Sequence, residues 1–172
     1  MEKLAPLFER HHHQLFNFFV QLTGNREASE DLVQDVFLRI LKYRHTFREP
    51  GEFTTWMYQI ARHANHDAWR KQRPEARKPD EAAPQEAEPV CPAPTPDERL
   101  SQTQEFTLLQ QALARLPASQ REILVLSQIQ RMKYDAIAAI LECEIGTVKV
   151  RVHRALKALQ EIFHQMNQEK RL

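Results

Sequence analysis

The sequence predicts an all-α protein in which two small helical domains are joined by a disordered linker. Apolar residues recur every three to four positions on both sides of a proline-rich segment, and no stretch shows sustained two-residue alternation. The three glycines, at 24, 51 and 146, each lie between two such periodic stretches. Seven of the ten prolines fall within residues 74–98. These breaks predict three helices before the proline-rich segment and four after it.

The first three helices are bounded by glycine and proline. The first carries Leu and Phe residues at helical spacing and stops at Gly24, and the second covers about 26–42. After the Pro-Gly pair at 50–51, Thr54 and Thr55 are candidate N-caps of a third helix that reaches about Arg73. This predicts a compact helical unit over the first part of the chain.

The second half begins with a helix that Pro117 ends. Ser119 and Glu122 then have the spacing of a capping box, in which each side chain satisfies a backbone N–H at the start of a helix. A five-residue turn ending at Gly146 separates the last two helices, and Thr147 is a candidate N-cap of the final one. We therefore expect helices over about 100–116, 120–130, 134–141 and 147–166.

Charge divides the chain in the same way as proline does. Residues 1–73 have a net charge of +2, residues 74–98 of −5 and residues 99–172 of +4. The middle segment has almost no large apolar residue, so burial there cannot offset the entropy of ordering it. At about 3.1 Å per residue, an extended linker of this length reaches roughly 75 Å. We predict domains over 1–73 and 99–172, joined by a flexible acidic linker.

Several classes of protein are excluded by what the sequence lacks. It has no apolar run long enough for a membrane helix and no signal peptide, so we expect a cytoplasmic protein. Cys91 and Cys143 are far apart and form no CxxC motif. His11, His12 and His13 would point about 100° apart on a helix, which favours a polar patch or tag-like run over a metal site. With no catalytic motif present, we expect no enzyme, cofactor or metal.

The segment YDAIAAILECEIGTVKVRVHRALKALQEIF, residues 134–163, has the pattern of a helix-turn-helix. A short apolar helix and a glycine-containing turn precede a longer helix whose Val148, Val152 and Ala155 should face the core. Between 147 and 160 that helix has four basic side chains and no acidic one. A recognition helix places such side chains against base edges and phosphates in the major groove. The combination favours DNA binding over a merely solvated basic face.

This part of the chain resembles region 4 of the extracytoplasmic-function sigma factors. The matching features are the Leu-Pro at 116–117, the Tyr-x-x-Ile-Ala at 134–138 and the Gly-Thr-Val-Lys-x-Arg at 146–151. The resemblance implies that this domain recognises the minus-thirty-five promoter element. Val150 stands where the family usually has serine; it can contact a thymine methyl but cannot hydrogen-bond. The implied upstream DNA-binding residues are Thr147, Lys149, Val150, His153, Arg154 and Lys157.

The segment ASEDLVQDVFLRILK, residues 28–42, is similar to the polymerase-binding helix in region 2 of the same family. Polar residues at spacings of three and four form a ridge opposite an apolar stripe. On its own this pattern indicates an ordinary amphipathic helix. The resemblance implies that the ridge binds core RNA polymerase through Asp31, Gln34, Asp35, Phe37 and Arg39.

The third predicted helix, FTTWMYQIARHANHDAWRKQR, combines aromatic residues with a basic stripe. That combination suits single-stranded DNA, where bases stack and cations follow phosphates; we interpret Trp56 as a core residue. The resemblance implies recognition and melting of the minus-ten element, with His63 at a place where many members have asparagine. The implied downstream DNA-binding residues are Arg62, His63, Asn65, His66, Asp67, Arg70, Lys71 and Arg73.

Together these features predict an alternative sigma factor that binds core RNA polymerase and promoter DNA, both as duplex and as melted single strand. The resemblance also implies an anti-sigma factor as a partner. Two alternatives remain at this point. A stand-alone helix-turn-helix regulator would explain the C-terminal half but would leave the second and third helices without a role. A pure protein-interaction module, such as an anti-sigma antagonist, would not need the basic recognition helix.

Overall fold

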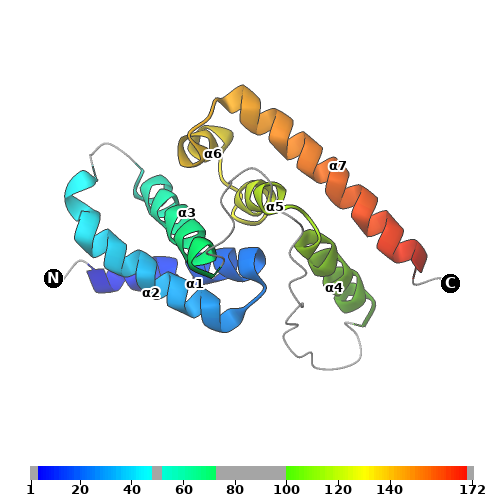
Figure 1. The fold of residues 1–172 in the computed structure, drawn as a ribbon, viewed down its shortest axis with the longest axis horizontal. Coiled ribbons are helices and arrows are strands. Elements are labelled where there is room, and N and C mark those ends of the chain that lie inside the picture. The colour runs from blue at the N-terminus through cyan, green and yellow to red at the C-terminus, as the bar shows by residue number, and fades with distance from the viewer. Residues whose placement is uncertain (1–3, 48–51, 73–99, 170–172) are drawn as a thin grey trace.

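The computed structural model describes residues 4–47, 52–72 and 100–169, and helices joined by short turns make up all the regular structure of these residues (Figure 1). The proline-rich segment, with Cys91, lies outside the described residues, as does Arg73. The all-α prediction is confirmed. The elements are α1 (Leu4–Thr23), α2 (Arg26–Tyr43), the 3₁₀ turn η1 (Arg44–Thr46), α3 (Phe53–Gln72), α4 (Leu100–Ala114), α5 (Ala118–Leu124), the π-helical turn η2 (Val125–Ile129), α6 (Tyr134–Leu141) and α7 (Ile145–Glu169).

The break between α1 and α2 lies where the sequence predicts it. Gly24 has a φ of 66°, in the left-handed region that favours glycine, and its N–H donates to the Val20 carbonyl at 2.9 Å. Asn25 then caps α2, because its side-chain oxygen accepts a hydrogen bond from the Ala28 N–H at 3.1 Å. A glycine C-terminus followed directly by an asparagine N-cap turns the chain sharply and lets α1 and α2 pack side by side.

The predicted threonine caps of α3 are wrong. The helix begins at Phe53, and the Trp56 N–H donates to the Glu52 carbonyl at 3.2 Å. Thr54 and Thr55 therefore lie within the first turn, where their side chains are half-buried. A threonine next to a proline-glycine break indicates a helix start only to within one or two residues.

The predicted capping box of α5 is also wrong. The Pro117 carbonyl accepts hydrogen bonds from the Gln120 and Arg121 N–H groups, at 3.0 and 2.9 Å, so the helix begins at Ala118. Ser119 lies inside the first turn instead of at its start. Glu122, the other member of the predicted box, is buried at the contact with α3.

The turn of the helix-turn-helix differs from the prediction in its left-handed residue. Glu142 ends α6 with a φ of 53°, and the Val148 N–H already donates to the Glu144 carbonyl at 3.1 Å. Gly146 and Thr147 therefore lie in the first turn of α7, so Thr147 is not its N-cap. A β-carbon at Gly146 would meet no atom within 4 Å, so neither φ nor packing requires glycine there.

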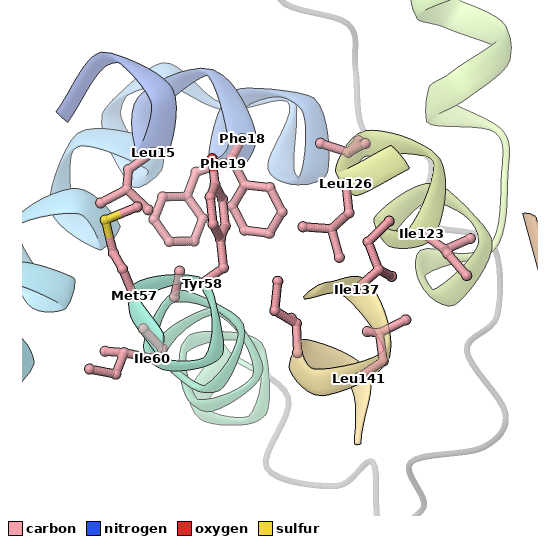
Figure 2. Packing of buried hydrophobic residues seen from close by; sticks show 14 of the residues in the cluster. Leu15, Phe18, Phe19, Met57, Tyr58, Ile60, Ile123, Leu126, Ile137 and Leu141 are labelled. Carbon is pink, nitrogen blue, oxygen red and sulfur yellow. The ribbon is translucent and has the colours of Figure 1, made fainter. Parts of the chain in front are cut away.

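One hydrophobic core runs through both halves of the described chain (Figure 2). Figure 2 shows Phe18 and Phe19 of α1 and Tyr58 of α3 in one cluster with Leu126 of η2 and Ile137 of α6. All five side chains are buried, and Phe18 and Tyr58 meet edge to face with ring centroids 5.1 Å apart. The helices of the two halves thus pack against each other, α1 on η2 and α3 on α6.

Two side-chain hydrogen bonds reinforce this contact between the halves. The Tyr58 hydroxyl donates to Gln130 Oε1 at 2.8 Å, and Gln59 Nε2 donates to the Ala139 carbonyl at 2.9 Å. Burial raises the pKa of Tyr58, so its hydroxyl stays a protonated donor. The first bond joins α3 to the end of η2, and the second joins α3 to α6.

Arg121 holds three helices together from inside the protein. It is 4% exposed, and its guanidinium donates to the carbonyls of Leu113 at 3.1 Å, Leu116 at 3.1 Å and Leu22 at 2.8 Å, and also to that of Ala114. These carbonyls lie at the C-terminal ends of α4 and α1, where backbone acceptors have no partner within the helix. Burial lowers the pKa of Arg121, and its position at negative helix ends offsets part of that cost.

Candidate functional site

The outward face of α7 presents the side chains predicted for the upstream DNA. Lys149, His153 and Lys157 follow one another at intervals of four, and all are exposed. Val150 and Arg154 form an adjacent exposed line, and Thr147 is half-buried at the start of the helix. Residues on these two lines point in neighbouring directions, so all six lie on one side of α7.

The opposite face of α7 fixes the orientation of this surface. Val148, Val152 and Ala155 are buried in the shared core, where α5 and α6 pack against them. Ile137 and Ile140 of α6 lie in the same core. Because the inward residues are locked by packing, the outward side chains have a defined direction, as binding through a rigid helix requires.

The basic stripe of α3 is divided between two sides of the helix. His63, His66, Arg70 and Lys71 are exposed, whereas Asn65 is half-buried. The remaining predicted residues, Arg62 and Asp67, both form ion pairs within the protein. Trp56 packs against Phe47 and Phe53, with ring centroids 5.3 and 5.9 Å apart, as expected for a core residue.

Arg62 faces the C-terminal half. Its Nε lies 3.3 Å from Glu122 Oε1 and donates to Oε2 at 3.4 Å. Desolvation lowers the pKa of the neighbouring His66, and the negative charge of Glu122 opposes that effect. The sequence could not predict this contact because Arg62 and Glu122 are 60 positions apart and no motif connects them. In the described arrangement, Arg62 is not a free cation.

Asp67 faces α2. Its carboxylate accepts hydrogen bonds from Arg39 Nη1 at 2.8 Å and from Arg70 Nη2 at 2.5 Å, and Arg39 Nε also donates to Asp35 at 3.0 Å. Asp35 and Arg39 belong to the set predicted for polymerase, whereas Asp67 and Arg70 belong to the set predicted for DNA. The structure therefore connects two sets that sequence reasoning treats as independent.

The outward ridge of α2 differs from the prediction at one apolar position. Asp31 and Gln34 are exposed, as a binding ridge requires. Phe37 is only 6% exposed and packs on Phe8, with ring centroids 4.7 Å apart, so in this arrangement it lies in the core and not on the exposed ridge. Leu38, which the spacing of the polar ridge did not indicate, is 66% exposed on this side of the helix. Two adjacent apolar residues flank the edge of the stripe, and periodicity alone does not decide which one faces outward.

The histidine run does not form a uniform polar patch. His11 is buried, and its ring centroid lies 5.4 Å from that of Phe53. The ring of His12 stacks on that of Phe8 with centroids 4.9 Å apart, and His12 Nδ1 lies within hydrogen-bond distance, 3.0 Å, of the Phe8 carbonyl oxygen. No group of three metal-ligating side chains occurs within 4–47, 52–72 and 100–169. Cys143 is a half-buried free thiol. None of the helices in the same ranges is long and apolar enough to span a membrane.

Comparison with known proteins matches both halves of the chain to one family. Residues 7–75 match the family model of sigma-70 region 2, and residues 106–159 match that of sigma-70 region 4. The chain is 32% identical to the ECF RNA polymerase sigma factor EcfG of Rhodopseudomonas palustris over 147 residues, which are 86% of this chain and 77% of the relative. It is 27% identical to the ECF RNA polymerase sigma factor SigW of Bacillus subtilis over 165 residues, covering 93% and 88%.

Solved structures share the arrangement of the helices. The sigma factor RpoE of Bartonella quintana, crystallised with the anti-sigma factor NepR, superposes with a TM-score of 0.74 at 27% identity, covering 95% of this chain and 98% of that one. CnrH, solved with the cytosolic domain of CnrY, superposes with a TM-score of 0.69 at 20% identity, covering 94% and 88%, which shows the fold alone.

Proposed function

The chain belongs to the extracytoplasmic-function sigma factors of RNA polymerase, and we propose how its surfaces divide the work of initiation. As a sigma factor it binds core RNA polymerase and directs initiation to specific promoters. The observation on which this rests is that one chain matches both region 2 and region 4 of the family. A stand-alone regulator would need region 4 alone.

The exposed face of α7 is the surface for the upstream, minus-thirty-five element. Lys149, His153, Arg154 and Lys157 supply hydrogen-bond donors and positive charge on one side of a helix that the core holds rigidly. Val150 is 49% exposed in the middle of this face. An exposed valine there favours an apolar contact such as the methyl group of thymine.

The exposed part of α3 is the surface for the downstream, minus-ten element. His63, His66, Arg70 and Lys71 offer ring faces for stacking and cations for the phosphates of a melted strand. Arg62 joins this surface only after it leaves Glu122, because Glu122 offsets its charge and its side chain is only 23% exposed in the described arrangement. Opening the duplex is then driven by binding of exposed bases, and the factor performs no covalent chemistry and needs no cofactor.

The outward ridge of α2 is the surface for core polymerase. Asp31 and Gln34 provide polar contacts, and Leu38 provides an apolar side chain that is mostly exposed when the factor is free. An exposed leucine among polar residues is the arrangement in which docking buries new apolar area and excludes water from the surrounding contacts. The acidic linker, with its net charge of −5, would pass through a positively charged channel of the enzyme.

An anti-sigma factor is the remaining partner. The sigma factor RpoE, which this chain resembles at 27% identity, was crystallised with the anti-sigma factor NepR. We propose that this chain is likewise held inactive by a protein of that kind, and that it acts with polymerase in the cytoplasm.

Reconstitution with core RNA polymerase and a promoter library tests the proposal. We expect transcripts that begin downstream of a shared two-part sequence, and none from core enzyme alone. Tight binding to duplex DNA without polymerase, combined with no initiation in its presence, would instead support the stand-alone regulator. The promoter that this experiment selects supplies the DNA for the measurements below.

A further inference from the structure

Four charged side chains join α2 to α3 in a continuous chain of ion pairs. Asp35 accepts from Arg39, Arg39 also donates to Asp67, and Arg70 donates to the other oxygen of Asp67. The side chains at the two ends are more exposed than those in the middle. Asp35 and Arg70, at the ends, are 43% and 74% exposed, whereas Arg39, in the middle, is 23% exposed. This series of ion pairs therefore begins at Asp35, on the α2 ridge proposed for polymerase, and ends at Arg70, on the α3 surface proposed for DNA.

The two central groups depend strongly on each other. Desolvation acts to lower the pKa of Arg39, but the hydrogen bonds to Asp67 and Asp35 outweigh it and raise that pKa. For Asp67, the hydrogen bond from Arg39 is the largest of the influences that lower its pKa, ahead of the one from Arg70. Asp67 thus owes more of its stabilisation as an anion to Arg39 than to Arg70.

Arg70 has more hydrogen-bond donors than its contact with Asp67 uses. A guanidinium has five N–H donors, and Arg70 donates to Asp67 through Nη2. While Arg39 compensates the charge of Asp67, the remaining donors and the positive charge of Arg70 are available to a phosphate. Without Arg39, Asp67 would be a negative charge directly beside the DNA surface, and it would attract Arg70 away from the phosphate.

We propose that Arg39 is a positioning residue for promoter DNA: through Asp67 it keeps Arg70 available to a backbone phosphate, and through Asp35 it links that contact to polymerase docking. The proposal rests on the function assigned above to α2 and α3. A polymerase group that binds the Asp35 carboxylate leaves Arg39 to Asp67 alone. Docking then strengthens the DNA contact and, by reciprocity, DNA strengthens docking.

The salt dependence of DNA binding measures the first part of this proposal. Reconstituted holoenzyme is titrated with the labelled non-template strand of the selected promoter at several salt concentrations. The slope of log K against log salt is negative, and loss of one phosphate contact to a single strand reduces its magnitude by about 0.7. We expect that decrease for both Arg39→Gln and Arg70→Gln, with affinity falling roughly two- to fivefold, as for one exposed ion pair.

The double variant distinguishes positioning from a general structural effect. If Arg39 acts through Arg70, Arg39→Gln should change neither slope nor affinity further in an Arg70→Gln background. Arg39→Lys, which keeps the cation, should retain most of the slope. Arg10→Gln removes the same charge from the exposed surface of α1 and should leave the slope unchanged. Additive losses in the double variant, or an unaltered slope in Arg39→Gln, would overturn the proposal.

Direct titration of Asp67 checks the intermediate step. Carboxyl NMR of the free chain should show the pKa of Asp67 below the ordinary aspartate value of about 3.9, and Arg39→Gln should raise it toward that value. If this pKa is the same in both proteins, Arg39 does not compensate Asp67 and the mechanism is wrong. The measurement needs no DNA, so it is independent of the proposed function.

The link to polymerase is measured by a matched pair of substitutions on one ridge. The affinity of the factor for core polymerase is compared with and without saturating non-template strand. The wild type should bind more tightly with DNA present, Asp31→Asn should keep that ratio, and Asp35→Asn should reduce it. Equal ratios for the two variants, or no tightening in the wild type, would refute the coupling. If wild-type holoenzyme does not bind the strand at all, the proposed DNA surface fails and the inference with it.

Discussion

Replacing Arg121 with methionine removes a buried cation and leaves a side chain of similar length. The guanidinium donates to four backbone carbonyls, and the bonds to Leu113 and Leu116 are fully buried. After the substitution, the Leu113 carbonyl still accepts a hydrogen bond from the Leu116 N–H at 3.2 Å. The Leu116 carbonyl, in contrast, loses its hydrogen bond from Arg121 Nη2. The perturbation therefore leaves buried acceptors unpaired at the ends of helices.

The size of the loss follows from how many acceptors stay unpaired. One unpaired buried acceptor costs about 1–3 kcal/mol, and the bonds to Leu22 and Ala114 are lost at partly buried positions that water reaches more easily. Burial of the charged guanidinium also has a cost, which is seen in the lowered pKa of Arg121. Removing that charge recovers this cost and offsets part of the lost stability. We expect the free energy of unfolding to fall by about 2–4 kcal/mol, which is a large share of the stability of a typical domain. Arg121→Lys, with three donors on one atom, should lose an intermediate amount.

Urea unfolding followed by far-UV circular dichroism measures this change. The midpoint should shift with little change in slope, because stability and not the area exposed on unfolding is altered. Arg115→Met removes an exposed cation from the end of α4 and should change stability by less than about 0.5 kcal/mol. A loss below about 1 kcal/mol for Arg121→Met, or one equal to that of the control, would show that the carbonyls do not depend on this side chain.

Four further substitutions test separate parts of the structure. Leu38→Ala should weaken binding to core polymerase by about tenfold, because docking buries most of a leucine side chain, and should leave thermal unfolding unchanged; calorimetric titration that finds equal affinity would remove Leu38 from the interface. Glu122→Gln should release Arg62 and raise the affinity for the non-template strand roughly two- to fivefold in an anisotropy titration, whereas unchanged or weaker binding would mean that Arg62 does not contact DNA. Glu142→Gly should stabilise the fold by about 0.5–1 kcal/mol, because a φ of 53° is strained for a residue with a β-carbon. Gly24→Ala should destabilise the fold by a similar amount for the same reason. Calorimetry that finds Glu142→Gly less stable than Gly24→Ala would contradict this reasoning from backbone strain.

The elements and their outward faces could be predicted because both depend on local spacing. A period of 3.6 residues fixes which side chains of a helix share a face, so the exposed basic side of α7 and the buried Val148, Val152 and Ala155 agree with the sequence analysis. Helix starts were less predictable. Threonine and serine satisfy backbone N–H groups at several positions near a helix start. The candidate caps of all three helices therefore lie within a first turn instead: Thr54 and Thr55 in α3, Ser119 in α5 and Thr147 in α7.

Choices between neighbouring apolar residues were beyond the sequence. Phe37 and Leu38 both border the apolar stripe of α2, and the nearby ring of Phe8 explains why Phe37 is the buried one. The same limit applies to the DNA surface of α3. Its basic residues look equivalent in sequence, yet Arg62 pairs with Glu122 whereas Arg70 is largely exposed.

By itself the sequence determined the helical fold, the family and the polarity of each helix face, because these follow from residue spacing and composition along short segments. Only the tertiary structure decided that α1 and α3 share a core with η2 and α6, that Arg121 closes the ends of α1 and α4, and that an ion-pair chain connects Asp35 to Arg70. Each of these depends on contacts between side chains that are distant along the chain. Such contacts are selected by packing and charge in three dimensions, where the pattern of one segment holds no information about its partner.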